Sequence, residues 1–252
     1  MAKPAAAVRT DGRLLKYDID ALRRVIAVAG GKGGSGKTTT TLGLANALTR
    51  RGARVIAADA DWDLPNLARL ATERTDLLAD RQPVPIDEAM AEEWNEFLSV
   101  RQARKTPTVL AEPPAPQAVD AHETFATLAD MVPADAATLL DCPAGASPDA
   151  TAPLRAADRS ILVTPLHRAA LRDTAKTAAM ARRLDCPPLG VVATRTTRVP
   201  SGLTKLFGCP VLGKIPTAAP MPLATAAVRA AYDRVAASIA GREGCTQWRI
   251  AE

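Results

Sequence analysis

A glycine-rich stretch with two lysines runs from Gly30 to Thr40, and it contains the spacing G-x-x-x-x-G-K-T between Gly31 and Thr38. Glycine allows the backbone to turn successive N–H groups toward one point, and a helix that begins there adds the positive end of its dipole. A nest of amides of this kind binds anions. A glycine-rich turn that carries Lys-Thr by chance is the alternative, but an apolar run precedes the stretch and a helical pattern follows it. The stretch therefore predicts a loop that cradles a triphosphate.

The polar side chains of this loop suit the chemistry of a magnesium-bound nucleotide. Lys37 supplies a positive charge for the β and γ phosphates, the Thr38 hydroxyl is the expected magnesium ligand, and Thr39 can donate to the α phosphate. We therefore predict a bound nucleoside triphosphate together with Mg²⁺. The predicted nucleotide-binding residues of the loop are Gly31, Gly33, Gly34, Ser35, Gly36, Lys37, Thr38 and Thr39.

Carboxylates follow two further apolar runs. Asp59 and Asp61 come after Arg-Val-Ile-Ala-Ala, and Asp141 comes after Ala-Thr-Leu-Leu and opens the sequence Asp-Cys-Pro-Ala-Gly. If both runs are parallel strands, these carboxylates lie at the edge of the sheet where ligands bind. Asp141 is expected to hold magnesium through water, as in a Walker B strand, and Gly145 can offer its backbone N–H to the γ phosphate. An aspartate after a strand can instead cap a helix or solvate a turn, and we expect this simpler role for Asp63.

These residues need strands that bring them to one edge and helices that cover the sheet. Short apolar runs alternate with alanine-rich helical stretches, which predicts an α/β fold, namely a doubly wound, mostly parallel sheet with helices on both faces. The segment 81–120 contains many prolines and is expected to be an irregular surface excursion. The predicted strands are 24–29, 54–58, 108–110, 137–140, 160–164, 191–194 and 211–215, and the main predicted helices are 38–51, 169–184 and 223–239.

The length and composition indicate one domain. A chain of 252 residues is long enough for one large α/β domain and short for two. We divide it into a basic N-terminal arm at 1–23, a P-loop domain at 24–240 and a C-terminal tail at 241–252. The four cysteines are too scattered for a zinc or redox motif, so reduced thiols are expected. No apolar run approaches the roughly 20 residues of a membrane span, and we expect a cytoplasmic protein.

The motifs resemble those of a known family. The sequence Lys-Gly-Gly-Ser-Gly-Lys-Thr at Lys32 to Thr38 resembles the deviant Walker A motif of the MinD/ParA ATPases, and Asp-Cys-Pro-Ala-Gly resembles the Asp-Ser-Pro-Ala-Gly of MinD-like members. The resemblance implies a P-loop NTPase fold, ATP as the substrate, and a homodimer that sandwiches two ATP molecules. It also implies that Lys32 reaches the nucleotide of the partner subunit, that Asp61 positions the attacking water, and that Asp59 supports the magnesium shell.

Together these assignments give a set of predicted site residues. The catalytic residues are Lys32, Lys37 and Asp61, and the metal-site residues are Thr38, Asp59 and Asp141.

The chain departs from the family pattern in two places. Family members place an adenine-recognising asparagine after the strand that matches 191–194, whereas this chain has Thr197 at about that position, and we expect its hydroxyl to contact the base. The basic amphipathic helix with which MinD-type proteins bind membranes is interrupted here by Gly241 and Gly244, so membrane binding is not expected. DNA bound without sequence preference stays open as a partner, with a simple solvated surface as the alternative. The basic residues concerned are Arg195, Arg198, Lys205, Lys214 and Arg229.

The leading functional hypothesis is a Mg-ATP-dependent dimerising ATPase of the MinD/ParA type. It would act as a nucleotide switch in cellular positioning, partitioning or regulation, with slow ATP hydrolysis that an unidentified protein activator or cargo stimulates. One alternative is a nucleotide-binding scaffold that does not hydrolyse. A further alternative is a metal-cluster carrier ATPase, which would need paired cysteines at a dimer interface, and the sequence contains no C-x-x-C.

Overall fold

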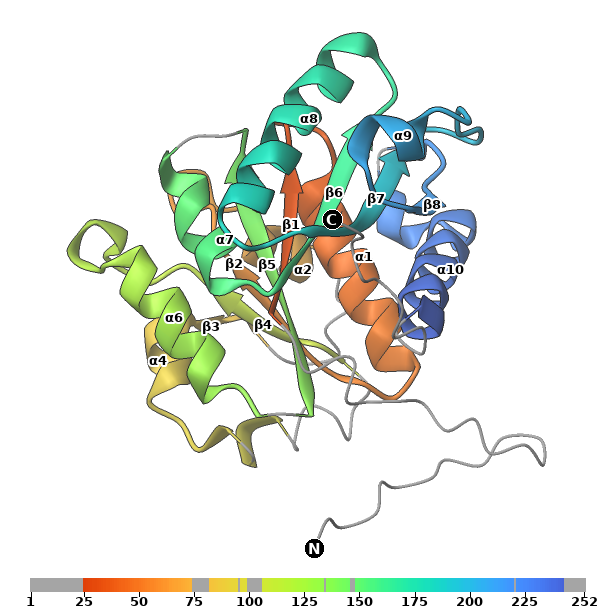
Figure 1. Ribbon diagram of the computed structural model, residues 1–252. Helices are drawn as coiled ribbons and strands as arrows, with labels where there is room; N and C mark the ends of the chain where they lie inside the picture. The colour runs from red at the N-terminus through yellow and green to blue at the C-terminus, as the bar shows by residue number, and fades with distance from the viewer. Residues whose placement is uncertain are drawn as a thin grey trace, which may run out of the picture.

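The computed structural model describes residues 25–73, 82–94, 96–98, 106–133, 135–145, 148–219 and 221–242. These residues contain an eight-stranded sheet with the order β3-β4-β2-β5-β1-β6-β7-β8, in which all neighbouring strands are parallel (Figure 1). The predicted α/β fold is therefore confirmed. The strands are β1 (Val25–Gly30), β2 (Arg54–Asp59), β3 (Val84–Pro85), β4 (Thr108–Ala111), β5 (Ala136–Ala144), β6 (Arg159–Pro165), β7 (Pro188–Thr194) and β8 (Val211–Lys214).

Helices connect these strands and cover both faces of the sheet (Figure 1). The α-helices are α1 (Lys37–Arg50), α2 (Leu67–Thr72), α4 (Ile86–Met90), α6 (Ala121–Met131), α7 (Thr151–Ala156), α8 (Arg168–Arg183), α9 (Leu203–Phe207) and α10 (Ala226–Arg242). The described residues also include the 3-10 helices η2 (Pro116–Ala118), η3 (Pro148–Ala150) and η4 (Pro222–Ala224).

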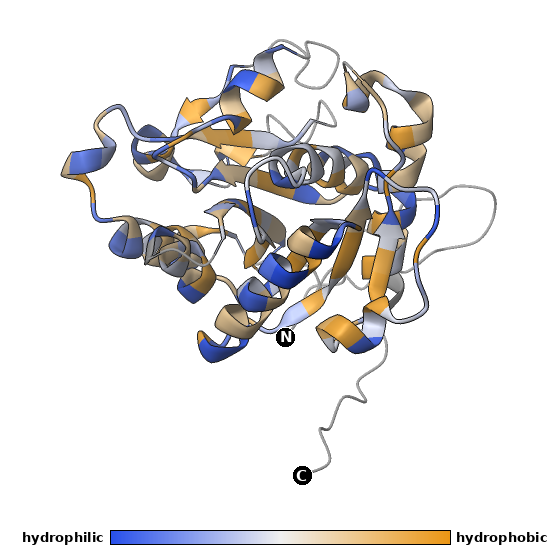
Figure 2. Cartoon of the chain, turned by 90° about the horizontal axis from the view of Figure 1, so that it is seen from above, coloured by the Kyte–Doolittle hydropathy of each residue, from blue (hydrophilic) through white to orange (hydrophobic). Residues whose placement is uncertain are grey.

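The core lies on both faces of the sheet because successive strand residues point in opposite directions. Ile26 and Val28 of β1 pack in a cluster with residues of α1, α2 and α10. Val25, Ala27 and Ala29 pack on the other face in a cluster with residues of α4, α6, α7 and α8. Figure 2 shows hydrophobic residues along the strands and hydrophilic residues on the outer parts of the helices. A sheet covered on both faces needs continuous apolar runs, and this explains the strand patterns in the sequence.

The described part of segment 81–120 contributes more to the core than the sequence predicted. It contains β3, α4, β4 and η2, and β3 and β4 extend the sheet beyond β2. Ile86, Trp94 and Leu98 are buried in the same cluster as residues of α6. The prediction of an irregular surface excursion was wrong for these residues, because prolines such as Pro85 and Pro116 fall at the ends of elements, where they are compatible with regular structure.

Both ends of the chain lie outside the described residues. The predicted basic arm at 1–23 lies outside the described residues, and so do residues 243–252 of the predicted tail. Among the helices that the structure describes, none has the length and apolar character needed to cross a membrane.

Helix α10 packs against α1, the helix that follows the glycine-rich loop. Tyr232 of α10 is fully buried, and its hydroxyl lies 3.2 Å from the Thr40 hydroxyl in the first turns of α1. A Cβ atom added to Gly43 would lie 2.4 Å from two ring carbons of Tyr232, so only glycine allows this approach. The C-terminal helix is thus seated directly on the helix that carries Lys37.

We expect Gly43→Ala to destabilise the protein although alanine favours helix. The gain in helix propensity is about 1 kcal/mol, whereas the clash with the Tyr232 ring costs on the order of 1–3 kcal/mol or more. Urea denaturation should show a net loss in the free energy of unfolding. In a Tyr232→Leu background the same substitution should cost much less, and an unchanged cost there would rule out the ring as the cause.

Candidate functional site

The glycine-rich loop leaves the carboxyl end of β1 and leads into α1. Gly34 and Gly36 have positive φ values of 71° and 97°, which L side chains rarely adopt. Gly36 is the N-cap residue of α1, and no side chain caps this end of the helix. The first amides of a helix lack partners within the helix, so here they are available to an anionic ligand.

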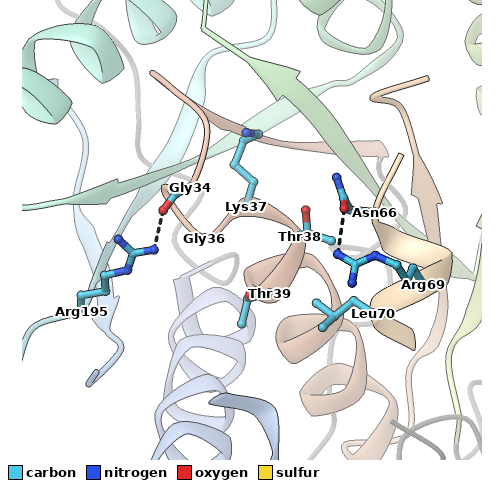
Figure 3. A pocket seen from close by; sticks show the side chains of 9 residues that line it. All are labelled: Gly34, Gly36, Lys37, Thr38, Thr39, Asn66, Arg69, Leu70 and Arg195. Carbon is cyan, nitrogen blue, oxygen red and sulfur yellow. Dashed lines mark hydrogen bonds between the residues drawn. The ribbon is translucent and has the colours of Figure 1, made fainter. Parts of the chain in front are cut away.

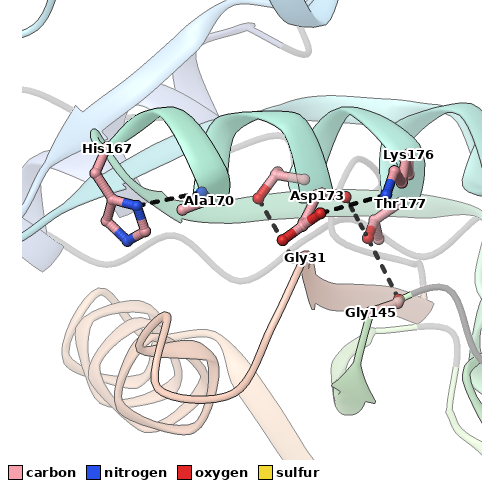
Figure 4. Close-up of polar contacts among 8 residues, drawn as sticks. Gly31, Gly145, His167, Ala170, Asp173, Lys176 and Thr177 are labelled. Carbon is pink, nitrogen blue, oxygen red and sulfur yellow. Dashed lines mark hydrogen bonds and ion pairs between the residues drawn. The ribbon is translucent and has the colours of Figure 1, made fainter.

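Helix α8 and the turn after β5 hold the start of this loop (Figure 4). The Gly31 amide donates to the Thr174 hydroxyl at 3.3 Å, and a Cβ atom on Gly31 would lie 2.2 Å from the Thr174 nitrogen. The Gly145 amide donates to the Gly30 carbonyl at 3.0 Å, and Thr177 donates to the Gly145 carbonyl at 3.3 Å. A contact between the Gly145 amide and a γ phosphate stays a prediction, and it requires this bond to Gly30 to be released.

Lys37 and Lys32 differ in their surroundings. Lys37 is 8% exposed, and its charge opposes the burial that raises the pKa values of Asp61 and Asp141. Lys32 is half-buried near the tip of the loop. Lys37 is therefore the more enclosed of the two lysines.

Asp59 anchors the segment that follows β2. Its Oδ1 accepts the Asp61 amide at 3.0 Å, and its Oδ2 accepts the amides of Asn66 and Leu67 at 3.0 and 2.9 Å. Burial raises the pKa of Asp59 to about 6 although these amides oppose the shift. The carboxylate thus holds a loop and the start of α2, and a role in the magnesium shell stays a prediction.

Trp62 gives this segment a second anchor. Its indole N–H donates to the Asp59 carbonyl at 2.9 Å, and its ring lies 5.1 Å from the ring of Phe125 in α6, measured between centroids. The loop between β2 and α2 is therefore fixed at both its carboxylate and its aromatic side chain.

Asp141 lies beside Asp59, because β2 and β5 pair with these two residues in register. It is 2% exposed, its Oδ1 accepts a hydrogen bond from the Thr41 hydroxyl at 3.1 Å, and the nearby Thr38 hydroxyl favours the charged form of the carboxylate. Burial, reinforced by the charge of Asp59, raises the pKa of Asp141 to about 7. A carboxylate that is costly to ionise in isolation is one that a nearby cation would stabilise in its charged form.

The oxygen donors at this position fit a magnesium ion. The Thr38 hydroxyl and the Asp141 carboxylate are hard oxygen ligands that lie next to each other. Within the described residues no group of three or more His, Cys, Asp or Glu side chains could hold a metal. This donor set suits Mg²⁺, which is commonly bound by one or two protein groups together with phosphate oxygens and water.

Asp61 and Asp63 follow Asp59 in the same loop. Asp61 is half-buried, and burial raises its pKa, while the Leu64 amide and the charge of Lys37 oppose the shift. Asp63 is exposed. Asp61 is thus the more buried of these two carboxylates.

A pocket of about 290 Å³ opens over the start of α1 (Figure 3). Arg195 approaches it from the carboxyl end of β7, and Arg69 and Leu70 of α2 approach it from the other side. The lining residues are Gly34, Gly36, Lys37, Thr38, Thr39, Asn66, Arg69, Leu70 and Arg195.

Five of the predicted site residues line this pocket, namely Gly34, Gly36, Lys37, Thr38 and Thr39. The other predicted residues are not among its lining residues, namely Gly31, Lys32, Gly33, Ser35, Asp59, Asp61, Asp141, Gly145 and Thr197. Thr197 is exposed in the loop after β7, and its carbonyl accepts a hydrogen bond from Lys214 at 2.6 Å. Sequence reasoning missed Arg69 as a site residue and treated Arg195 only as a candidate for DNA binding. The positions of Arg69 and Arg195 in the sequence could not predict this, because only the folded arrangement brings α2 and the end of β7 to the pocket.

Comparison with known proteins agrees with this geometry. The CbiA family, described as the CobQ/CobB/MinD/ParA nucleotide binding domain, matches residues 26–226. The septum site-determining protein MinD of Synechocystis is 29% identical over 170 residues, which cover 63% of this chain and 59% of that protein. Matches to other curated relatives cover similar shares, so the chain spans about half to three fifths of the length of the MinD relatives it matches.

Two solved structures share the fold. The cell division ATPase MinD of Pyrococcus furiosus has a TM-score of 0.69 and 24% identity, covering 86% of this chain and 98% of that one. MinD of Pyrococcus horikoshii, solved in complex with Mg-ADP, has a TM-score of 0.67 and 23% identity, covering 84% of this chain and 94% of that one. At 24% and 23% identity, the similarity to these two structures shows the fold alone.

The buried carboxylates predict an unusual pH dependence of stability. The pKa of Asp141 rises from 3.8 to about 7 on folding, so between these values the folded state holds a proton that the unfolded chain releases. Without nucleotide and metal, the free energy of unfolding should therefore fall as the pH rises from about 4 to about 7. Asp59, with a pKa of about 6, contributes in the same direction.

We expect Asp141→Asn to remove the contribution of Asp141 to the pH dependence of the free energy of unfolding. The variant should be more stable than the wild type at pH 8, by on the order of 1–4 kcal/mol, and closer to it at pH 4. Urea titrations at pH 4, 6 and 8 in the presence of a chelator would measure this. If the free energy of unfolding changed with pH in the same way in both proteins, position 141 would not hold an ionisable carboxylate that is shielded from water.

Proposed function

The chain belongs to the CobQ/CobB/MinD/ParA nucleotide-binding family, and from this we propose that it is a Mg-ATP-dependent ATPase whose two subunits close around ATP. The observation that carries the proposal is the meeting of Lys37, the Thr38 hydroxyl and Asp141 at one edge of the sheet, beside a helix end without a side-chain cap. Phosphoryl transfer from a nucleotide requires a positive charge at the phosphates, and it requires a hydroxyl and a carboxylate that can hold magnesium.

In the proposed reaction, water attacks the γ phosphorus of ATP, the bond to the bridging oxygen breaks, and ADP and phosphate are formed. The amides of the glycine-rich loop and Lys37 bind the phosphates and offset the charge that develops on them. Bound magnesium, held by Thr38 and Asp141, would add further positive charge at the phosphates. Asp61 would orient the attacking water and accept a hydrogen bond from it, and the influence of the Lys37 charge on Asp61 supports this role.

The proposed dimer depends on Lys32. This lysine is half-buried at the loop, and in the proposal it crosses the subunit interface to the partner's γ phosphate, as the family resemblance implies. A cation delivered across an interface in this way makes closure depend on the triphosphate. ATP would then favour the closed dimer and hydrolysis would favour its separation.

The proposed switch would act on a protein partner in cellular positioning, partitioning or regulation. Among the basic residues considered for nonspecific DNA binding, Arg195 donates to the Gly34 carbonyl and Lys214 donates to the Thr197 carbonyl, and both side chains are exposed. DNA bound without sequence preference therefore stays an alternative partner. We place the protein in the cytoplasm, where ATP and magnesium are available and the buried thiols of Cys142, Cys186 and Cys209 stay reduced.

Asp61→Asn should separate binding from hydrolysis. The variant keeps the size of the side chain but loses its charge, so phosphate release from Mg-ATP should fall by about 10²–10⁴-fold while the Kd for Mg-ATP changes only a few-fold. Lys37→Ala is the contrasting control and should weaken binding itself. Unchanged turnover in Asp61→Asn would remove this residue from the proposed reaction.

Lys32→Ala should separate nucleotide binding from dimer formation. We expect the variant to bind Mg-ATP in the monomer, and we expect its mass in analytical ultracentrifugation to stay that of a monomer when a non-hydrolysable ATP analogue is added. Lys205→Ala, an exposed lysine outside the pocket lining, serves as the matched control and should still dimerise. A wild-type protein that remains monomeric with the analogue would overturn the dimer proposal.

A further inference from the structure

The carboxyl end of β7 is bonded to the middle of the glycine-rich loop. The Arg195 guanidinium donates to the Gly34 carbonyl at 2.7 Å (Figure 3). The Thr194 hydroxyl donates to the Ser35 carbonyl at 2.8 Å. In the sheet β6 lies between β1 and β7, so the loop reaches across the end of β6 to make these contacts. Two successive carbonyls of the loop are therefore fixed by two successive side chains of another element.

These bonds determine where the loop amides point. In a trans peptide the C=O and the following N–H point in opposite directions. Drawing the Gly34 carbonyl toward Arg195 turns the Ser35 N–H to the other side of the loop, and drawing the Ser35 carbonyl toward Thr194 does the same to the Gly36 N–H. Amides in this part of the loop form the anion nest that the sequence predicts.

The two donors are themselves held in place. Thr194 is 5% exposed, and a Cβ atom on Gly36 would lie 3.5 Å from the Thr194 methyl group, so the two residues are in contact. Arg195 has a φ of 55°, a left-handed conformation that is unusual for a residue with a side chain. The hydrogen bonds from the Thr196 amide to the Ile215 carbonyl and from the Ile215 amide to the Ala193 carbonyl fix the backbone on either side of Arg195.

A strained residue that is kept by its surroundings suggests a function for its side chain. We propose that Thr194 and Arg195 are positioning residues that preset the amides of the glycine-rich loop for phosphate binding. The proposal rests on the proposed nucleotide binding and deepens it. It assigns the triphosphate affinity in part to β7, an element that does not itself belong to the phosphate-binding motif.

The test compares two ligands in variants chosen to keep the fold. Thr194→Val keeps the branched shape but loses the hydroxyl, and Thr194→Ser keeps the hydroxyl. Arg195→Gly removes the guanidinium and tolerates the positive φ without strain. For each folded protein we would measure the Kd of Mg-ATP and of inorganic tripolyphosphate, which lacks base and sugar, together with the free energy of unfolding without ligand.

We expect Thr194→Val and Arg195→Gly each to raise the Kd of both ligands by about tenfold, because each variant loses one well-placed hydrogen bond. The Kd values of Thr194→Ser should stay within about threefold of those of the wild type. A purely structural role would lower the free energy of unfolding and leave both Kd values unchanged, which would overturn the proposal. If Arg195→Gly bound Mg-ATP more weakly than the wild type but bound tripolyphosphate equally well, the proposal would also be overturned, because the arginine would then contact the nucleoside.

The same measurements keep this inference distinct from the proposed function. A wild type that binds Mg-ATP, with variants that bind both ligands equally well, would overturn the role of Thr194 and Arg195 alone. A wild type that binds neither ligand would overturn the proposed function, and this inference with it.

Discussion

Parallel pairing of the strands is the constraint on which the site depends. Because all neighbouring strands run in the same direction, the carboxyl ends of β1, β2, β5 and β7 lie at one edge of the sheet. The register of β2 with β5 then sets Asp59 directly beside Asp141, and β1 delivers the glycine-rich loop between β5 and β6. Functional groups from four separate parts of the chain thus meet without any long loop having to carry them there.

The buried carboxylates at this edge of the sheet suit a site that binds a cation. Two carboxylates lie buried side by side, and burial raises the pKa values of both toward neutrality. The Thr41 hydroxyl donates to Asp141 and three backbone amides donate to Asp59, but these hydrogen bonds do not remove the cost of ionisation. Stability is therefore lower than the same fold would have with neutral side chains, as is common where a site is arranged for function. A bound cation would supply the positive charge that stabilises the ionised carboxylates.

The glycine-rich loop is fixed from several directions, although its glycines could by themselves adopt many conformations. Helix α8 lies against Gly31, the turn after β5 bonds to Gly30, and β7 bonds to Gly34 and Ser35. Each contact uses a backbone group of the loop, so the loop's conformation is set by its surroundings while its remaining amides stay available to a ligand. An ordered nest binds an anion with less loss of conformational entropy than a flexible one.

The sequence by itself determined the glycine-rich loop, its strand and helix, the α/β class and the family resemblance, because these depend on residue types at short, fixed spacings. Asp59, Asp61 and Asp141 could be predicted as site candidates for the same reason, since each follows a recognisable apolar run. Only the tertiary structure decided that Asp59 anchors a loop, that β3 and β4 extend the sheet, and that Thr174 and Thr194 hold the glycine-rich loop from 143 and 159 residues away. Such contacts leave no periodic signal, because they depend on the strand order and on glycines that permit close approach between distant segments.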